Sequence, residues 1–272
     1  MSVARITARF AALAADGRAA FIPYIVAGDP DLDTAERILA GLPGAGADLI
    51  ELGLPFSDPM ADGPAIQLGA TRALAGGMTT AAVLDLVRRF RAGDQVTPII
   101  LMGYYNPIFS HGLDAFAGQA AAAGVDGLIM VDVPPEEADP LCDALDAHDI
   151  ALIRLATPTT DTQRLAVVAR RTRGLVYFVA VTGVTGAKEA DPAAIAAQVG
   201  RVRAACALPV AVGFGIRTPE RAAEVARIAD AAVVGSALVA EITAQIALKR
   251  DPVAKVLDTA AAMAQAVRLA RA

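Results

Sequence analysis

Short apolar runs alternate with longer, alanine-rich amphipathic runs along the chain. Each short run spans four to six residues and is apolar at almost every position. This pattern is typical of parallel strands covered by helices, because such strands are buried on both faces. The pattern predicts eight strands, at Phe21–Val26, Leu49–Leu52, Pro98–Met102, Gly127–Val131, Ala151–Leu155, Leu175–Val179, Pro209–Val212 and Ala231–Val234.

Signals for the start of a helix lie between several of these strands. A residue that caps a helix, followed by proline at the first helical position, is a typical start. Such pairs occur at Asp191-Pro192, Thr218-Pro219 and Asp251-Pro252, and Pro134-Pro135-Glu136-Glu137 indicates a further helix start.

Eight strands, each followed by a helix, are the number that closes a (β/α)8 TIM barrel. An open, doubly wound sheet is the main alternative. Val3–Ala15 is predicted to form an extra helix that caps the N-terminal end of the barrel. No Pro/Ser-rich linker or break in composition divides the chain, so we expect residues 1–272 to form a single TIM-barrel domain of the α/β class.

The composition narrows the class of protein. With 55% hydrophobic residues and a mean hydropathy of +0.49, the chain has enough apolar surface for a large core. A net charge of -5 offers no basic field for nucleic acid or an anionic membrane. The uncharged stretch Gln95–Leu113 is broken by proline and glycine, and the N-terminus does not resemble a signal peptide. Cys142 and Cys206 are expected to be small buried hydrophobic residues. Together these features predict a soluble cytoplasmic protein.

Carboxylates gather after the second predicted strand. Glu51 ends an apolar run, where alternation places its side chain in the barrel mouth. An apolar mouth raises the pKa of a carboxyl group, which suits a general acid or base. Asp58 and Asp62 follow in a proline-stiffened loop and are able to flank a small substrate with Glu51. A solvated strand end with turn or cap aspartates fits the same spacing, so both interpretations stay open.

Three glycine-rich loops follow the sixth, seventh and eighth predicted strands. They are Thr182–Gly186, Gly213–Ile216 and Gly235-Ser236, and the last opens a predicted helix at Ala237–Leu248. Glycine lets backbone N–H groups approach an anion, and a helix N-terminus favours phosphate. Barrel enzymes often bind phosphate with the loops after strands seven and eight. Phosphate binding is therefore favoured over ordinary turns.

Other types of catalytic residue are scarce. Lys188, Lys249 and Lys255 are the three lysines, and none lies at a predicted strand end, which disfavours a Schiff-base mechanism. His111, in a predicted loop, and His148 belong to no cluster of metal ligands, so no metal site is expected. The residues alone predict a barrel enzyme that acts on a phosphorylated small molecule by carboxylate acid–base chemistry.

The same residues resemble the tryptophan synthase alpha subunit family over nearly the whole chain. Glu51–Gln67 matches the most specific signature of the family, and Phe21–Pro30 resembles its first strand and loop. Asp132-Val133-Pro134, Thr182–Ala187, Gly213–Ile216 and Gly235-Ser236 follow in the order of the family.

The resemblance implies retro-aldol cleavage of indole-3-glycerol phosphate to indole and glyceraldehyde 3-phosphate. It makes Glu51 the general acid and base, Asp62 the acceptor of the indole N–H hydrogen bond, and Tyr177 a tyrosine near the catalytic glutamate. It further implies substrate-binding positions at Tyr24, Met102, Tyr104, Asp132, Thr185, Gly186, Phe214, Gly215, Gly235 and Ser236.

The resemblance also implies a partner. Family members dock on a beta subunit that contains pyridoxal phosphate (PLP), in an alpha2beta2 heterotetramer, and pass indole to it. The alpha chain itself is expected to need no cofactor. Loops at about Pro55–Gly63 and Thr182–Asp191 are expected to close over the substrate and contact the partner.

Two departures from the family and two alternatives remain. Ala180-Val181 stands where many members carry serine, sometimes followed by a basic residue, and Tyr24 stands where some carry phenylalanine.

Another phosphate-binding barrel enzyme is one alternative, for example a sugar-phosphate isomerase or the synthase that forms indole-glycerol phosphate. The synthase would require a catalytic lysine in the pocket. The other alternative is a non-catalytic activator of the beta subunit.

Overall fold

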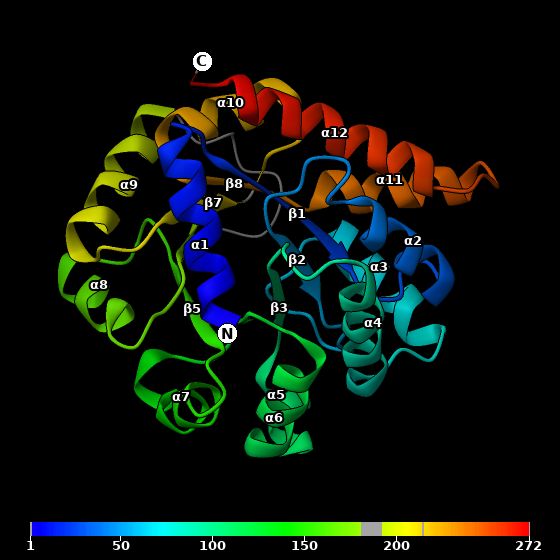
Figure 1. The fold of residues 1–272 in the computed structure, drawn as a ribbon, viewed down its shortest axis with the longest axis horizontal. Helices are drawn as coiled ribbons and strands as arrows, with labels where there is room; N and C mark the ends of the chain where they lie inside the picture. Colours follow the sequence, from blue (N-terminus) through cyan, green and yellow to red (C-terminus); the bar gives the residue numbers. More distant parts are fainter. Residues whose placement is uncertain (1, 181–191, 214, 272) are drawn as a thin grey trace.

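The computed structural model describes residues 2–180, 192–213 and 215–271. Eight parallel strands form a closed barrel in the order of the sequence (Figure 1), and β1 closes it by pairing with β8. The structure therefore confirms the TIM barrel and excludes the open sheet. All eight predicted strands are present within two residues of their expected bounds, at β1 Ala20–Val26, β2 Ile50–Gly53, β3 Ile99–Gly103, β4 Gly127–Met130, β5 Ala151–Ala156, β6 Val176–Val179, β7 Val210–Gly213 and β8 Ala231–Val234.

Helices surround the barrel, and pairs of helices follow β2, β3 and β8. In order they are α1 Ser2–Ala15, α2 Leu32–Gly41, α3 Pro64–Ala75, α4 Thr80–Gly93, α5 Tyr105–His111, α6 Leu113–Ala123, the 3-10 helix η1 Pro135–Glu137, α7 Asp139–Asp146, α8 Thr162–Ala169, α9 Pro192–Ala205, α10 Pro219–Ile228, α11 Ser236–Ala247 and α12 Val253–Leu269. No described helix is long and apolar enough to cross a membrane.

The first residues of the helices can be compared with the starts that the sequence predicts. Thr218 caps α10 by accepting a hydrogen bond from the Arg221 N–H, as predicted. The prolines at 134–135 open only η1; α7 begins at Asp139, where Pro140 supplies a new first turn. Asp251 accepts the Val253 N–H, so α12 begins one residue later than the sequence indicates.

Two smaller predictions were wrong. His111 is the last residue of α5 rather than part of a loop, because the helix continues until Gly112, whose φ of 89° ends it. Cys206 is only half-buried, whereas Cys142 is buried as expected.

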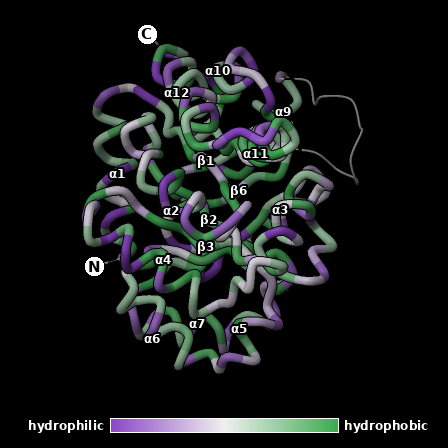
Figure 2. The backbone as a smooth tube through the Cα atoms, turned by 90° about the vertical axis from the view of Figure 1, so that its right-hand side faces the viewer, coloured by the Kyte–Doolittle hydropathy of each residue, from purple (hydrophilic) through white to green (hydrophobic). Residues whose placement is uncertain are grey.

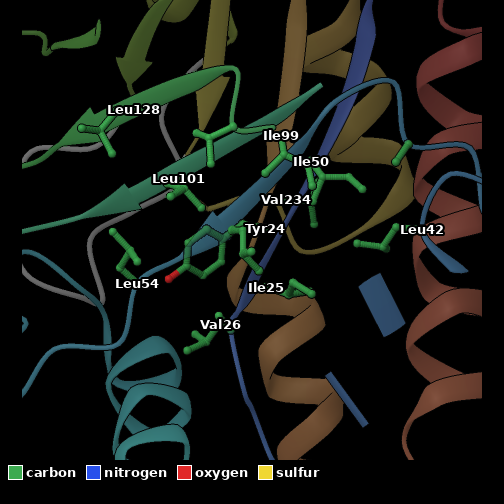
Figure 3. Packing of buried hydrophobic residues seen from close by; sticks show 14 of the residues in the cluster. Tyr24, Ile25, Val26, Leu42, Ile50, Leu54, Ile99, Leu101, Leu128 and Val234 are labelled. Carbon is green, nitrogen blue, oxygen red and sulfur yellow. The ribbon is translucent and has the colours of Figure 1, made fainter. Parts of the chain in front are cut away.

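The strands alternate between the barrel interior and the helical layer. Inward side chains such as Ile22, Leu49 and Ile100 form one cluster, and α1 adds Ile6, Phe10 and Leu13 to it. This contact confirms that α1 caps the N-terminal end. Outward side chains join the helices in a second cluster, which also includes Tyr24 of the mouth and part of which Figure 3 shows. In Figure 2 the strand labelled β3 is coloured mainly as hydrophobic, whereas hydrophobic and hydrophilic stretches alternate along the helices.

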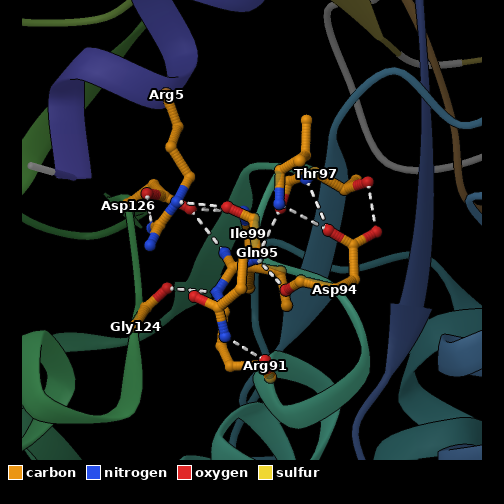
Figure 4. A network of polar contacts seen from close by, with 9 residues as sticks. Arg5, Arg91, Asp94, Gln95, Thr97, Ile99, Gly124 and Asp126 are labelled. Carbon is orange, nitrogen blue, oxygen red and sulfur yellow. Dashed lines mark hydrogen bonds and ion pairs between the residues drawn. The ribbon is translucent and has the colours of Figure 1, made fainter.

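Buried carboxylates organise the N-terminal end of the barrel (Figure 4). Asp126, immediately before β4, accepts the Ile99 N–H at 2.8 Å, Arg91 Nη2 at 2.7 Å and Arg5 Nη1 at 2.5 Å. Arg91 also donates to the carbonyl oxygens of Gly124, Asp94 and Thr97. The Asp126 network thus ties α1 and α4 to the start of β3 and β4.

The same arrangement occurs before two other strands. Asp48 accepts the Phe21 N–H at 2.9 Å and pairs with Arg9 of α1. Asp230 accepts the Val210 N–H at 2.8 Å and pairs with Arg203 of α9. In each case a carboxylate before one strand holds an amide at the start of the preceding strand.

Candidate active site at the barrel mouth

Glu51 lies on the inward face of β2, opposite Tyr24 of β1 and Ile100 of β3 in register. Glu51 is only 1% exposed. Among the described residues, its Oε1 atom has no hydrogen-bond partner. Burial raises its pKa to about 8, and the negative charge of Asp62 adds to the increase. The carboxyl group therefore keeps its proton at neutral pH and is ready to act as an acid.

Asp62 reaches the mouth from the loop between β2 and α3. Its Oδ2 accepts a hydrogen bond from the Tyr104 hydroxyl at 3.1 Å, and that hydroxyl accepts the Ala61 N–H at 2.9 Å. Phe56 stacks on the Tyr104 ring with 5.2 Å between centroids. Burial raises the pKa of Asp62, and the Tyr104 hydrogen bond opposes this increase. Tyr104 thus fixes the loop that carries Asp62.

Asp58 behaves differently from Asp62. It is exposed and accepts a hydrogen bond from the neighbouring Ser57 hydroxyl at 2.5 Å. Of the two loop aspartates, only Asp62 acts electrostatically on Glu51. Asp58 therefore lies apart from the buried pair of Glu51 and Asp62.

Three glycines make room for two tyrosines at the mouth. A Cβ on Gly53 would lie 2.2 Å from the Tyr24 hydroxyl, and one on Gly235 would lie 3.1 Å from the Tyr24 ring. A Cβ on Gly213 would lie 1.9 Å from the Tyr177 hydroxyl. Tyr24 and Tyr177 are both buried, and their pKa values are raised well above the usual range, mainly by burial. The glycines therefore admit tyrosine rings where other residues would close the mouth.

The residues predicted to bind phosphate are only partly described. Gly235 precedes α11, which begins at Ser236, one residue before the predicted start. The first amides of a helix have no partner within it, and its dipole favours an anion. Gly215 adopts a φ of 80°, which favours glycine. Thr185, Gly186 and Phe214, like the predicted second lid at 182–191, lie outside the described residues.

Asp132 and Met102 complete the predicted set. Asp132 is exposed and its Oδ1 accepts the Tyr105 N–H at 2.9 Å, so it holds the first turn of α5 against β4. Met102 is half-buried on β3, with Gly53 opposite it in register. Sequence reasoning missed the Asp132 contact, because nothing in a local pattern indicates an acceptor 27 residues away.

Two surface clefts lie away from the mouth. One, of about 370 Å³, is lined by α1 residues such as Phe10 and Leu13 and by Arg203 and Asp230, which already pair with each other. The other, of about 300 Å³, lies between α2 and α4. Within the described part of the chain, no group of acidic, histidine or cysteine side chains has the arrangement of a metal site. The mouth, where Oε1 of Glu51 has no partner among the described residues, is the better candidate site.

The fold and the site define a class of protein: a TIM barrel with a buried carboxyl group at the C-terminal mouth, where barrel enzymes hold their active sites. The sequence model of the tryptophan synthase alpha chain family matches residues 10–268. The chain belongs to this family, whose members are lyases that cleave indole-3-glycerol phosphate in tryptophan biosynthesis.

Known relatives extend over the whole chain. The tryptophan synthase alpha chain of Phenylobacterium zucineum is 66% identical, covering 100% of this chain and 98% of that protein. That of Caulobacter vibrioides strain NA1000 / CB15N is 62% identical with the same coverage. The crystal structure of the alpha subunit from Legionella pneumophila str. Paris superposes with a TM-score of 0.91 at 42% identity, covering 97% of this chain and 98% of that one.

Proposed function

We propose that Glu51 and Asp62 carry out the cleavage of indole-3-glycerol phosphate in this chain. The observation that supports this proposal most strongly is the environment of Glu51. It is buried at the mouth of the barrel, its pKa is raised to about 8, and a second carboxylate lies near it. A protonated carboxyl group at neutral pH is the acid that the first step requires.

In the proposed reaction, Glu51 gives its proton to C3 of the indole ring. The ring then holds a positive charge at its nitrogen, and Asp62 accepts the hydrogen bond of that N–H group. The bond between C3 and the glycerol chain breaks, and its electrons return to the ring. Glu51 takes the proton of the adjacent glycerol hydroxyl, so indole and glyceraldehyde 3-phosphate leave with Glu51 protonated again.

The remaining predicted residues bind and position the substrate in this proposal. Tyr24, Met102, Tyr104 and Tyr177 line the indole and glycerol part of the mouth, and Asp132 holds the β3–α5 loop at its edge. The phosphate binds at Gly215, Gly235 and Ser236, together with Thr185, Gly186 and Phe214. The α11 N-terminus supports this placement, because its amides and dipole favour an anion.

The partner in this proposal is a PLP-containing beta subunit, in an alpha2beta2 heterotetramer that works in the cytoplasm. Family membership supports a beta-subunit partner, and in the family PLP belongs to the beta subunit. A tryptophan synthase structure from M. tuberculosis, described as an aminoacrylate-bound form, contains a chain that matches this one with a TM-score of 0.86 at 34% identity. We also propose that residues 1–272 form one domain, which the packing of α1 and α12 on the barrel supports.

The test is indole release from indole-3-glycerol phosphate by the purified chain. Glu51→Gln removes the acid while keeping the side-chain shape, so we expect turnover to fall by about 10²–10⁴-fold, the usual value of general acid–base catalysis. Asp58→Asn, in the same loop as Asp62 but exposed, serves as the matched control and should keep near-normal turnover. Near-normal turnover by Glu51→Gln would overturn the assigned role.

The same assay tests the partner. We expect slow indole release by the isolated chain and faster release after a beta subunit is added. Equal rates with and without the beta subunit would contradict the proposed activation. No release under either condition by a folded wild-type chain that still binds a phosphate ligand would favour the non-catalytic activator instead.

A further inference from the structure

Gln67 connects the loop that carries Asp62 to helix α3. Its side-chain amide Nε2 donates to the Asp62 carbonyl oxygen at 2.9 Å and, over a longer 3.4 Å, to the Pro59 carbonyl oxygen. A primary amide has two N–H donors, so one glutamine is able to serve both oxygens. The Asp62 N–H also donates to the Pro59 carbonyl at 3.0 Å. Gln67 therefore holds both ends of the turn at residues 59–62.

The start of α3 directs this side chain to the loop. Gly63 precedes the helix and has no side chain with which to cap it. The Gln67 N–H donates to the Gly63 carbonyl at 3.0 Å, in the first turn of the helix. Side chains of a helix tilt toward its N-terminus, so the Gln67 amide reaches back to the residues before Gly63. Gln67 is exposed, so its amide can be removed without opening the hydrophobic core.

Helix α3 is itself fixed to the barrel. Arg72 Nε and Nη2 donate to the two carboxylate oxygens of Asp29 at 2.7 and 2.9 Å, which makes a bidentate pair. Asp29 lies in the loop after β1 and is buried. A Cβ on Gly69 would lie 2.8 Å from Asp29 Oδ2, so the glycine lets α3 approach this carboxylate. Helix α3 is therefore a fixed support for the loop that Gln67 holds.

Tyr104 holds other atoms of the same loop. Its hydroxyl donates to Asp62 Oδ2 at 3.1 Å and accepts the Ala61 N–H at 2.9 Å. Gln67 thus binds the backbone of Asp62, whereas Tyr104 binds its carboxylate. A bond of 3.1 Å between two oxygen atoms is at the long end of the usual range, so a small shift of the loop backbone is enough to weaken it.

We propose that Gln67 is a positioning residue for the cleavage: its amide holds the Asp62 loop on α3 and thereby keeps the Asp62 carboxylate on the Tyr104 hydroxyl. This inference rests on the proposed function, in which Asp62 accepts the indole N–H hydrogen bond. The acceptor has to lie where the ring nitrogen arrives, and the loop backbone decides that place. Gln67 acts through the position of Asp62 and not on the substrate itself.

The ionisation of Asp62 reports its position. The Tyr104 hydrogen bond lowers the pKa of Asp62, against the increase that burial causes. The other titratable groups that face it are Glu51 on β2, Tyr24 on β1 and Tyr177 on β6, whose pKa values the charge of Asp62 raises. Loss of the Gln67 amide should weaken the Tyr104 bond and therefore raise the pKa of Asp62.

The test is an NMR titration of the full chain labelled with ¹³C at the aspartate carboxyl carbon, in which Asp62→Asn identifies the Asp62 signal. Gln67→Met keeps the length and helix propensity of the side chain but has no donor. We expect it to raise the pKa of Asp62 by about 0.5 unit. Tyr104→Phe removes the bond entirely and should raise the pKa by about one unit.

Each of these variants has a matched control. Gln119→Met makes the same change at an exposed glutamine of α6, whose side chain contacts His111. Tyr105→Phe removes a hydroxyl from a ring that packs on Phe109 in α5. Both controls should leave the pKa of Asp62 unchanged.

A double variant shows whether Gln67 acts through Tyr104. The bond to Asp62 is absent in Tyr104→Phe, so adding Gln67→Met should cause no further increase in the pKa of Asp62. A further increase as large as that in the wild type would overturn the inference, and so would an unchanged pKa in folded Gln67→Met.

Steady-state kinetics give a second measurement of the same role. For Gln67→Met we expect a KM about threefold higher with a small change in kcat, the size of effect that one hydrogen bond gives. Because the titration needs no turnover, it decides the role of Gln67 even if Glu51→Gln remains active and the proposed function fails.

Discussion

Asp126 and Glu51 are buried carboxyl groups at opposite ends of the same barrel. Asp126, at the N-terminal end, receives a backbone N–H and two arginines. Glu51, at the C-terminal mouth, has an oxygen with no partner among the described residues and a second carboxylate nearby. Burial raises the pKa of both groups, but three donors oppose the increase at Asp126, whereas Glu51 reaches about 8.

If Glu51 has the proposed role, the difference separates the groups that stabilise this fold from the group that does its chemistry. At the N-terminal end, Asp126 and Asp48 hold strand starts and bind α1 through Arg5 and Arg9. At the mouth, glycines and tyrosines surround a carboxyl group that is costly to ionise. An unpaired buried acid lowers stability near neutral pH, whereas at the other end the removal of one partner from the paired network is what lowers stability.

The largest expected effect on stability is at the paired end. Asp126→Asn removes the countercharge of Arg91 and Arg5 but leaves Arg91 its carbonyl acceptors, so we expect a loss of about 3 kcal/mol. Thermal unfolding should show a midpoint lower by roughly 6–12 °C. Turnover measured well below that midpoint should stay near the wild-type value. Loss of turnover without a lower midpoint would contradict the proposal that the N-terminal end of the barrel stabilises the fold and the mouth carries the chemistry.

A smaller effect is expected at the mouth from Tyr104→Phe. The variant loses the hydrogen bonds to Asp62 and to the Ala61 N–H but keeps the stacking on Phe56. Two hydrogen bonds that order a loop contribute on the order of 1 kcal/mol, so KM should rise about fivefold with a small change in kcat. Steady-state kinetics beside Tyr105→Phe provide the comparison. Equal KM values for the two variants would show that Tyr104 does not fix the Asp62 loop.

The sequence predicts much of the barrel because each buried parallel strand is a nearly continuous apolar run. The inward position of Glu51 and the direction of its pKa shift follow from the same strand pattern and from burial. The predicted helix starts at 135 and 252 were less accurate, because a proline indicates the start of a helix only to within a few residues.

Contacts between distant segments were not predictable in this way. Arg5 and Asp126 are 121 residues apart, and their pairing depends on where α1 lies across the barrel. The contacts of Tyr24 with Gly53 and Gly235 depend on the register between neighbouring strands. Strand alternation identifies which residues share the face of Glu51, but not which residues on that face touch.

The most direct test of the central claim is the pH dependence of unfolding for the wild type and Glu51→Gln. In the unfolded chain Glu51 ionises near pH 4.5, whereas in the folded chain it keeps its proton up to about pH 8. Between these values the unfolded state binds fewer protons at Glu51, so the contribution of Glu51 to the unfolding free energy falls as pH rises, by up to about 1.4 kcal/mol per unit. The account predicts that Glu51→Gln gains stability relative to the wild type from about pH 5 to about pH 8, with no further gain above. A constant difference across this range would show that Glu51 has an ordinary pKa and would contradict the account.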